Sequence, residues 1–102
     1  MEIVEPTNIG FFIYSKSGCP NCMKLKTTLR DKSLLYIEVN CDDYLVEPED
    51  KETFLSFIRE KSSISLHIFP IVFFDGVYIG GYKEALVQID KLMVCFEDTV
   101  SF

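Results

Sequence analysis

The sequence predicts a small α/β protein in which a four-stranded mixed sheet is flanked by helices, in the order βαβαββα. Short apolar, β-branched runs alternate with segments of helical periodicity. The turn pair Asp75-Gly76 joins two apolar runs. The length of 102 residues suits one domain with one core. No repeat or domain boundary interrupts this order, so we expect a single domain over residues 1–102, with its core at about 9–96 and a loose tail at 97–102.

The first half of the chain predicts a strand, a helix and a second strand. Residues 9–15 are mostly aromatic or β-branched and end at a Ser-Lys-Ser-Gly turn, which indicates a buried strand. Pro20 suits the first turn of a helix, and apolar residues then follow at helical spacing to about Lys32. Residues 34–39 form the next strand. Two strands joined by a helix within about thirty residues predict a parallel, right-handed unit.

The second half predicts a helix, a hairpin and a last helix. After a polar connection at 40–48, a helix begins near Pro48 with acidic residues in its first turn, which suits the helix dipole. The runs 71–74 and 77–79 flank the turn pair and form the hairpin. Two glycines then precede the last helix, which carries apolar residues on one face.

Composition and charge exclude several classes of partner. The net charge of −6 makes nucleic acid and anionic membranes poor partners. The apolar runs are far too short to span a bilayer, and the first ten residues are acidic where a signal peptide is basic. We therefore expect a cytoplasmic protein, in which permanent disulfides are rare.

The positive charge is concentrated around the segment 16–32, which holds five lysine or arginine residues and the single acid Asp31. One interpretation is an ordinary solvated helix face. The other is a local positive field that favours a thiolate and an anionic ligand.

Cys19 and Cys22 form a Cys-x-x-Cys pair between the first strand and the first helix. Cys19 falls at the helix N-terminus, where free N–H groups and the helix dipole stabilise a thiolate, the nucleophilic form of the thiol. Cys22 lies on the same helix face one turn inside, so it should be less exposed and able to resolve a mixed disulfide on Cys19.

The alternative of a structural zinc site needs two more ligands at suitable spacing. The candidates are Cys41, Cys95 and His67, and none of them forms a second close pair. We expect Cys41 and Cys95 to be ordinary small thiols, with Cys41 the more open to oxidation because it follows a strand.

Three motifs in order resemble the glutaredoxin family: CPNC after an apolar strand, the proline of HIFPIVFF before a hairpin strand, and Gly80-Gly81 after the hairpin. The similarity spans about residues 9–94. A thioredoxin fits less well, because the chain has no tryptophan. The resemblance implies a thioredoxin fold, glutathione as the reductant, and thiol–disulfide exchange on protein disulfides and glutathionylated proteins.

The resemblance also implies roles for individual residues. Cys19 is the nucleophile, Cys22 resolves, and Lys16 lies near the glycine carboxylate of glutathione. The bond before Pro70 is cis, and the backbone before it pairs with the cysteinyl part of glutathione. His67 aligns with a position that touches the glycine carboxylate, although a loop histidine without a role is as good an interpretation. The implied glutathione-binding residues are Lys16, Pro20, Asn21, His67, Ile68, Phe69, Pro70, Gly80, Gly81 and Tyr82.

Three positions depart from the family pattern. Asn21 stands where many members have tyrosine, Phe69 brings bulk to the edge of the groove, and Lys83 stands where we expect an aspartate that holds the γ-glutamyl ammonium. Lys83 should weaken glutathione binding unless Glu84 supplies the acid.

These residues leave three functions open. The first is a monomeric dithiol enzyme that uses glutathione and no metal in cellular redox homeostasis and electron transport. The second is a thioredoxin-like reductase of one protein partner with little glutathione dependence. The third is a dimer in which Cys19 from two chains and two glutathione molecules hold a [2Fe–2S] cluster.

Overall fold

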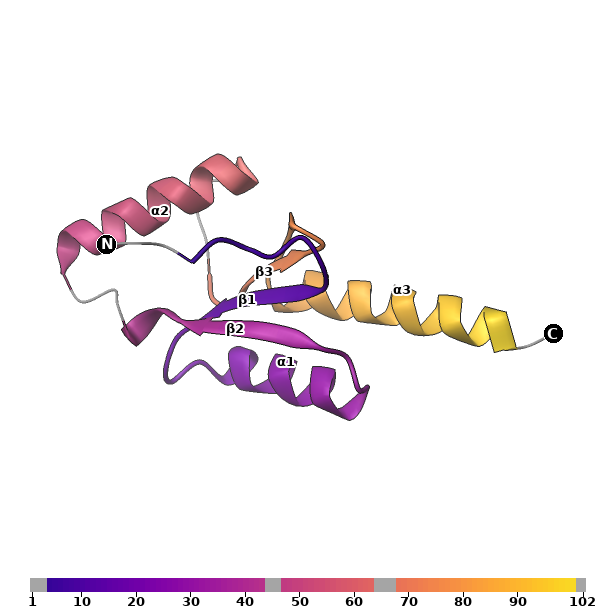
Figure 1. Cartoon of the computed structure of the whole chain (residues 1–102). Helices are drawn as coiled ribbons and strands as arrows, with labels where there is room; N and C mark the ends of the chain where they lie inside the picture. The colour runs from indigo at the N-terminus through magenta and orange to yellow at the C-terminus, as the bar shows by residue number, and fades with distance from the viewer. Residues whose placement is uncertain (1–3, 44–46, 64–67, 101–102) are drawn as a thin grey trace.

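The computed structural model describes residues 4–43, 47–63 and 68–100 and has a four-stranded mixed sheet with helices on both faces (Figure 1). The elements in chain order are β1 (Phe11–Ser15), α1 (Pro20–Asp31), β2 (Tyr36–Asn40), the 3-10 helix η1 (Cys41–Asp43), α2 (Pro48–Ser62), β3 (Ile71–Phe74), β4 (Val77–Gly80) and α3 (Tyr82–Val100). This is the thioredoxin fold, and it confirms the predicted element order and fold class.

The sheet is organised around β1. The strand order is β2-β1-β3-β4, with β1 parallel to β2 and antiparallel to β3, and β3 antiparallel to β4. Every residue of β1 is buried, which is why its sequence is a continuous run of aromatic and β-branched residues. The parallel β1-α1-β2 unit confirms the prediction for the first half of the chain.

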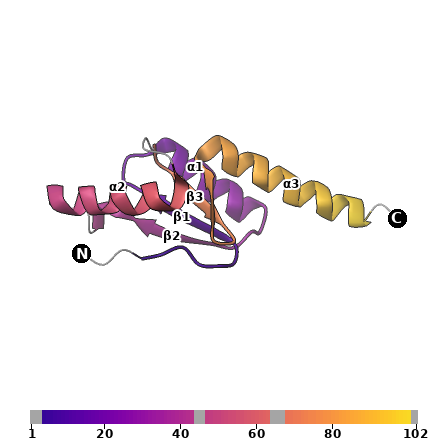
Figure 2. The same ribbon diagram turned by 90° about the horizontal axis from the view of Figure 1, so that it is seen from above.

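Helices cover the two faces of the sheet and create two cores. On one face, Leu25 and Leu29 of α1 pack with Ala85 and Ile89 of α3. On the other face, Phe54 and Ile58 of α2 pack against aromatic residues of β1 and β3. Figure 1 shows α1 and α2 on opposite sides of the sheet, and Figure 2 shows α3 projecting beyond its edge. Within the described residues, no helix is long and apolar enough to cross a membrane.

The hairpin turn adopts the conformation that its sequence predicts. Asp75 and Gly76 both have positive φ, 51° and 83°, as the tight turn between two twisted strands requires. The turn is tied to the segment before β1, because the N–H of Gly10 donates to Oδ1 of Asp75 at 2.7 Å. The N–H of Asp75 donates in return to the carbonyl oxygen of Gly10 at 3.0 Å.

Some element boundaries differ from those predicted. Gly10 has φ of 78°, so β1 begins only at Phe11. Ser33 has φ of 58° and ends α1, which delays β2 until Tyr36. α3 extends to Val100, into the segment 97–102 that we expected to be a loose tail. No glycine or proline occurs between Tyr82 and Val100 to stop the helix.

Glu38 on β2 connects the sheet to α1. Its Oε2 accepts hydrogen bonds from Nζ of Lys26 at 2.8 Å and from Oγ of Ser15 at 2.5 Å. Partial burial acts to raise the pKa of Glu38, but these two hydrogen bonds and the charge of Lys26 outweigh it. The pKa therefore lies below its ordinary value.

Shortening a buried leucine should destabilise the protein far more than shortening an exposed one. Leu29 is 0% exposed and Leu35 is 90% exposed. We expect Leu29→Ala to lower the free energy of unfolding by about 2–5 kcal/mol, because it leaves a cavity between α1 and α3. Leu35→Ala should change it by less than about 0.5 kcal/mol. Denaturant titration of both variants measures the difference, and equal losses would contradict this packing.

Removing the charge of Glu38 should produce a pH-dependent loss of stability. Because folding lowers the pKa of Glu38, its stabilisation is complete above the unfolded pKa and disappears as pH falls through the folded pKa. At neutral pH, Glu38→Gln should cost up to about 1 kcal/mol, since the ion pair is partly exposed. The difference from wild type should vanish in acid. Glu52→Gln, on an exposed position of α2, makes the same charge change and is the control in denaturant titrations at neutral pH, where it should change the free energy of unfolding by less than about 0.5 kcal/mol.

Candidate active site

The end of β1 and the start of α1 place Cys19 at a helix N-terminus. After Ser15 the chain turns through Gly18, whose φ of 72° favours glycine. Cys19 is the N-cap residue of α1 with extended backbone, and Pro20 occupies the first helical position. The predicted strand-to-helix junction is therefore confirmed.

The two cysteine sulfurs have different surroundings. They form a disulfide, and the N–H of Cys22 donates to Sγ of Cys19 at 3.2 Å. Cys22 is 2% exposed, whereas Cys19 is half-buried. The prediction that Cys22 is the less exposed of the two is confirmed, and Cys19 is the sulfur that an external partner can reach.

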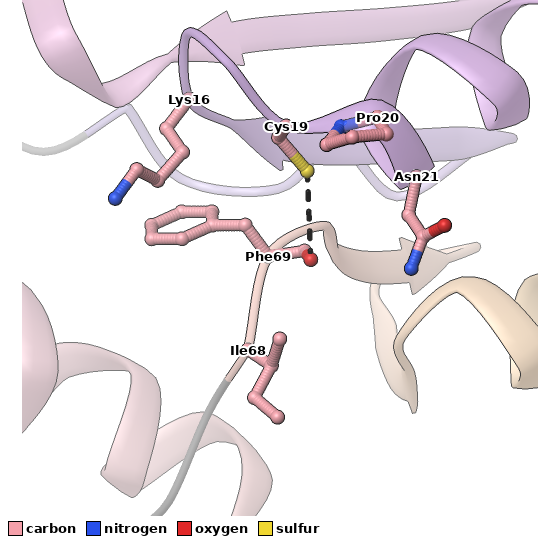
Figure 3. Close-up of a pocket in the computed structure, with 6 residues that line it drawn as sticks. All are labelled: Lys16, Cys19, Pro20, Asn21, Ile68 and Phe69. Atoms are coloured by element: carbon pink, nitrogen blue, oxygen red, sulfur yellow. Dashed lines mark hydrogen bonds between the residues drawn. The ribbon is translucent and has the colours of Figure 1, made fainter.

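The loop before β3 lies directly beside Cys19. The Phe69–Pro70 peptide bond is cis, as the family resemblance implied. Sγ of Cys19 lies 3.6 Å from the carbonyl oxygen of Phe69, the contact drawn as a dashed line in Figure 3. A reduced thiol in this position can donate a hydrogen bond to that carbonyl oxygen.

A cavity of about 490 Å³ opens beside the exposed sulfur. Its lining residues come from the β1–α1 turn, the first turn of α1 and the loop before β3: Lys16, Cys19, Pro20, Asn21, Ile68 and Phe69. Figure 3 shows Lys16 and the Phe69 ring on one side of the Cys19 sulfur and Asn21 on the other. The cavity thus combines one reactive sulfur, one cation and an apolar wall.

Phe69 is held from both sides. Its ring stacks on Phe54 of α2, with centroids 6.3 Å apart and planes 9° apart. Nζ of Lys16 lies 6.0 Å from the centroid of the Phe69 ring, within the range of a cation–π contact. The phenylalanine that departs from the family pattern therefore joins α2 to the cavity wall.

The other residues that the resemblance implied lie behind or beside the cavity. Pro70 and Gly80 are buried, and Tyr82 packs against the α1–α3 core. A side chain at Gly81 would meet the carbonyl oxygen of Pro70 at 3.5 Å, so Gly81 lies against the loop before β3. His67 lies outside the described residues.

Glu84 is a residue that the sequence indicated only weakly. Its Oε1 accepts a hydrogen bond at 2.8 Å from the N–H of Gly81, so the carboxylate turns back toward the two glycines. Burial, together with the charge of Glu84, raises the pKa of Tyr78 above its ordinary value. Lys83 lines a separate hollow with Ile79. The acid beside the two glycines is therefore Glu84.

A smaller hollow of about 230 Å³ adjoins the cavity and shares Lys16 and Phe69 with it. Cys41, Asp42 and Lys51 complete its lining, and the Asp42 carboxylate already accepts a hydrogen bond from the N–H of Ser17 at 3.0 Å. Cys41 is 1% exposed beneath α2, which confirms the expectation of an ordinary small thiol and leaves it less open to oxidation than its place after a strand suggested. No sequence pattern indicated that Lys51 lies near Cys19. It lines this hollow because the fold places α2 over the sheet.

A metal centre finds no support in the part of the chain that the structure describes. Nowhere in that part do three or more histidine, cysteine, aspartate or glutamate side chains gather closely enough to hold a metal ion. The side chains of His67 and Cys95, two of the ligands considered for zinc, lie outside the described residues.

Solved structures of similar fold agree with this architecture. The holo form of glutaredoxin C1 from Populus tremula x tremuloides aligns with a TM-score of 0.67 and 22% identity, covering 90% of this chain and 87% of its own. A buckwheat glutaredoxin–glutathione complex aligns with a TM-score of 0.63 and 20% identity, covering 80% of this chain and 69% of its own. Because both sequence identities are below 25%, these alignments establish that the chain shares the fold of these two proteins.

Sequence comparison establishes the family. The glutaredoxin family model matches residues 11–79, which include both cysteines and the loop before β3. Glutaredoxin 1 of Rickettsia felis is 30% identical over 79 residues, covering 78% of this chain and 70% of its own length. A glutaredoxin-like 8.6 kDa protein of Clostridium pasteurianum is 32% identical over 81 residues, covering 79% of this chain and 93% of its own. With a Cys19–Cys22 pair at the N-terminus of α1 and these matches, the chain belongs to the glutaredoxin family.

Proposed function

We propose that this protein is a glutathione-dependent thiol–disulfide oxidoreductase that reduces protein disulfides and glutathionylated proteins through Cys19 and Cys22. The observation that carries the proposal is the position of the Cys19 sulfur. It is half-buried at the N-terminus of α1, receives the N–H of Cys22, and borders a cavity with a cation. Such a site stabilises a thiolate and admits an anionic disulfide.

With a glutathionylated protein, the reaction uses Cys19 alone. The Cys19 thiolate attacks the glutathione sulfur of the mixed disulfide, and the protein thiolate leaves and takes up a proton. A second glutathione thiolate then attacks the glutathione sulfur bound to Cys19. This step releases oxidised glutathione and restores the Cys19 thiolate, so each turnover consumes one added glutathione, and the glutathione removed from the substrate forms the other half of the oxidised product.

With a protein disulfide, the reaction also uses Cys22. Attack by Cys19 joins the enzyme to one substrate sulfur and releases the other as a thiol. Cys22 lies one helical turn away and attacks Sγ of Cys19, which frees the second substrate thiol and leaves the Cys19–Cys22 disulfide. Two glutathione molecules then reduce that disulfide. Burial of Cys22 keeps it from competing with Cys19 for external disulfides.

The cavity has features that suit glutathione, a peptide with two carboxylates. Lys16 supplies a cation beside the Phe69 ring, and Lys51 supplies a second one in the adjoining hollow. The backbone at Ile68 and Phe69 lines the cavity next to the sulfur, where an extended peptide can lie. Glu84 offers a carboxylate near Gly81 for the γ-glutamyl ammonium. The buckwheat relative in complex with glutathione supports this choice of ligand.

Replacing each cysteine separately should separate the two reactions. Cys19→Ser should abolish glutathione-coupled reduction of both substrate types, because it removes the nucleophile. Cys22→Ser should keep the reaction with glutathionylated substrates and lose the reaction with protein disulfides. A coupled assay that follows oxidised glutathione measures both. Activity that persists in Cys19→Ser would refute the mechanism, and activity with a dithiol reductant but none with glutathione would favour a protein-specific reductase.

Lys16→Gln should weaken the use of glutathione. Because it removes the cation from the cavity, we expect kcat/KM for glutathione to fall about tenfold, with a smaller salt dependence than in wild type. Lys24→Gln is the matched control, since Lys24 is exposed on α1 and does not line the cavity. Equal effects of the two substitutions would show that glutathione does not bind beside Lys16.

A further inference from the structure

The proposed redox reaction does not use a hollow of about 350 Å³ between β4 and the first half of α3. We call it the β4–α3 groove. Its lining residues are Ile79 of β4 and Lys83, Glu84, Val87, Gln88 and Lys91 of α3. The groove therefore combines basic, amide and apolar side chains on one surface.

The groove carries positive charge in a chain whose net charge is −6. Lys83 and Lys91 are both exposed, and neither forms an ion pair with another described residue. Glu84 adds one negative charge at the end of the groove beside Gly81, so the lining carries two positive charges against one negative charge. Asp90 is exposed on α3 but does not line the groove. The two lysines attract an acidic segment, whereas the net charge of −6 on each molecule opposes pairing with a second copy of this chain.

The groove also has an apolar strip beside an open sheet edge. Val87 is 53% exposed and lies between the two lysines on the helix, and Ile79 lines the opposite wall. β4 is the last strand in the sheet order, so no strand of the described chain pairs with its outer edge. An extended segment in the groove thus has apolar contacts and the edge strand of the sheet within its reach.

The spacing of the side chains specifies the segment. Lys83 and Lys91 are eight residues apart on α3, which corresponds to about 12 Å along the helix axis. In an extended strand, residues four apart are separated by about 13 Å. Two acids four apart would therefore face the two lysines, with an apolar residue midway facing Val87. We propose that the β4–α3 groove binds an extended acidic segment of a partner protein with the pattern acidic-x-apolar-x-acidic.

The groove begins close to the redox site. Glu84 lines the groove and also bonds to Gly81, which lies against the backbone of Pro70. A protein held in the groove is therefore tethered near Cys19. The inference concerns peptide binding alone and requires no thiol chemistry. Its test is therefore independent of the test of the proposed function.

The test uses the wild-type protein and a fluorescein-labelled peptide of sequence Thr-Glu-Thr-Val-Thr-Glu-Thr, which has no cysteine. A second peptide with glutamine at both acidic positions is its control. Fluorescence anisotropy should show binding of the acidic peptide below about 1 mM and at least fivefold weaker binding of the glutamine peptide. The double variant Lys83→Gln, Lys91→Gln should weaken binding of the acidic peptide about fivefold to tenfold, and added salt should reduce the difference.

The chain offers a matched control for the double variant. Lys24 and Lys32 are also exposed and eight residues apart, on α1 and at its C-cap, so Lys24→Gln, Lys32→Gln makes the same charge change elsewhere. It should leave peptide binding unchanged. Equal weakening by both double variants, equal binding of the two peptides, or no binding by wild type would overturn the proposal. Amide NMR shifts on peptide addition should centre on residues 79–91, and shifts centred on Lys16 and Cys19 would also overturn it.

Discussion

The pairing of Tyr14 with Ile71 is the constraint on which the active site depends. These residues lie opposite each other in the antiparallel β1–β3 pair, one residue before the end of β1 and at the first residue of β3. Because of this register, the chain leaves β1 toward Cys19 at the place where the Phe69–Pro70 loop enters β3. A shift of one residue would turn the side chains of β3 to the opposite face and separate the loop from the sulfur.

Burial of β1 and β3 fixes this register, because a shifted register would expose their apolar side chains. Tyr14 is fully buried, and its ring packs edge-on against Phe54 and Phe73. Its hydroxyl donates to the carbonyl oxygen of Val4 at 2.6 Å, which satisfies the polar group of this side chain. Phe54 then stacks on Phe69, so the core on the α2 face continues without interruption into the wall of the cavity. The sulfur of Cys19 therefore lies beside a cavity wall that is anchored in the core.

Features that depend on local sequence were predictable. The Asp75-Gly76 turn, the helix that begins at Pro20 and the unequal burial of the two cysteines each follow from a few adjacent residues, and the structure confirms them. The boundaries of the strands were predicted less accurately. Gly10 and Ser33 have positive φ, and the strands that follow them therefore begin later than predicted. The end of α3 was missed because a polar tail without glycine or proline is compatible with both a helix and a coil.

Contacts between distant segments could not be predicted. The stacking of Phe54 on Phe69, the approach of Lys51 to Lys16 and the burial of Cys41 each need α2 to be placed on the sheet. The position of Glu84 depends on how the chain turns after β4, which the Gly-Gly pair leaves open. Sequence reasoning therefore found the more exposed sulfur and most of its neighbours and named Glu84 only as an alternative, but it did not find the side chains that α2 brings to the cavity.

Gly80 and Glu84 form a steric unit in which the space at position 80 depends on the side chain at position 84. Gly80 has φ of 131°, and a Cβ placed there would lie 2.6 Å from Cγ of Glu84. Any lineage that acquired a side chain at position 80 would have to displace the glutamate first, and with it the hydrogen bond that begins α3. The constraint runs in one direction, because position 84 can change while Gly80 stays, but a side chain at position 80 can only follow that change.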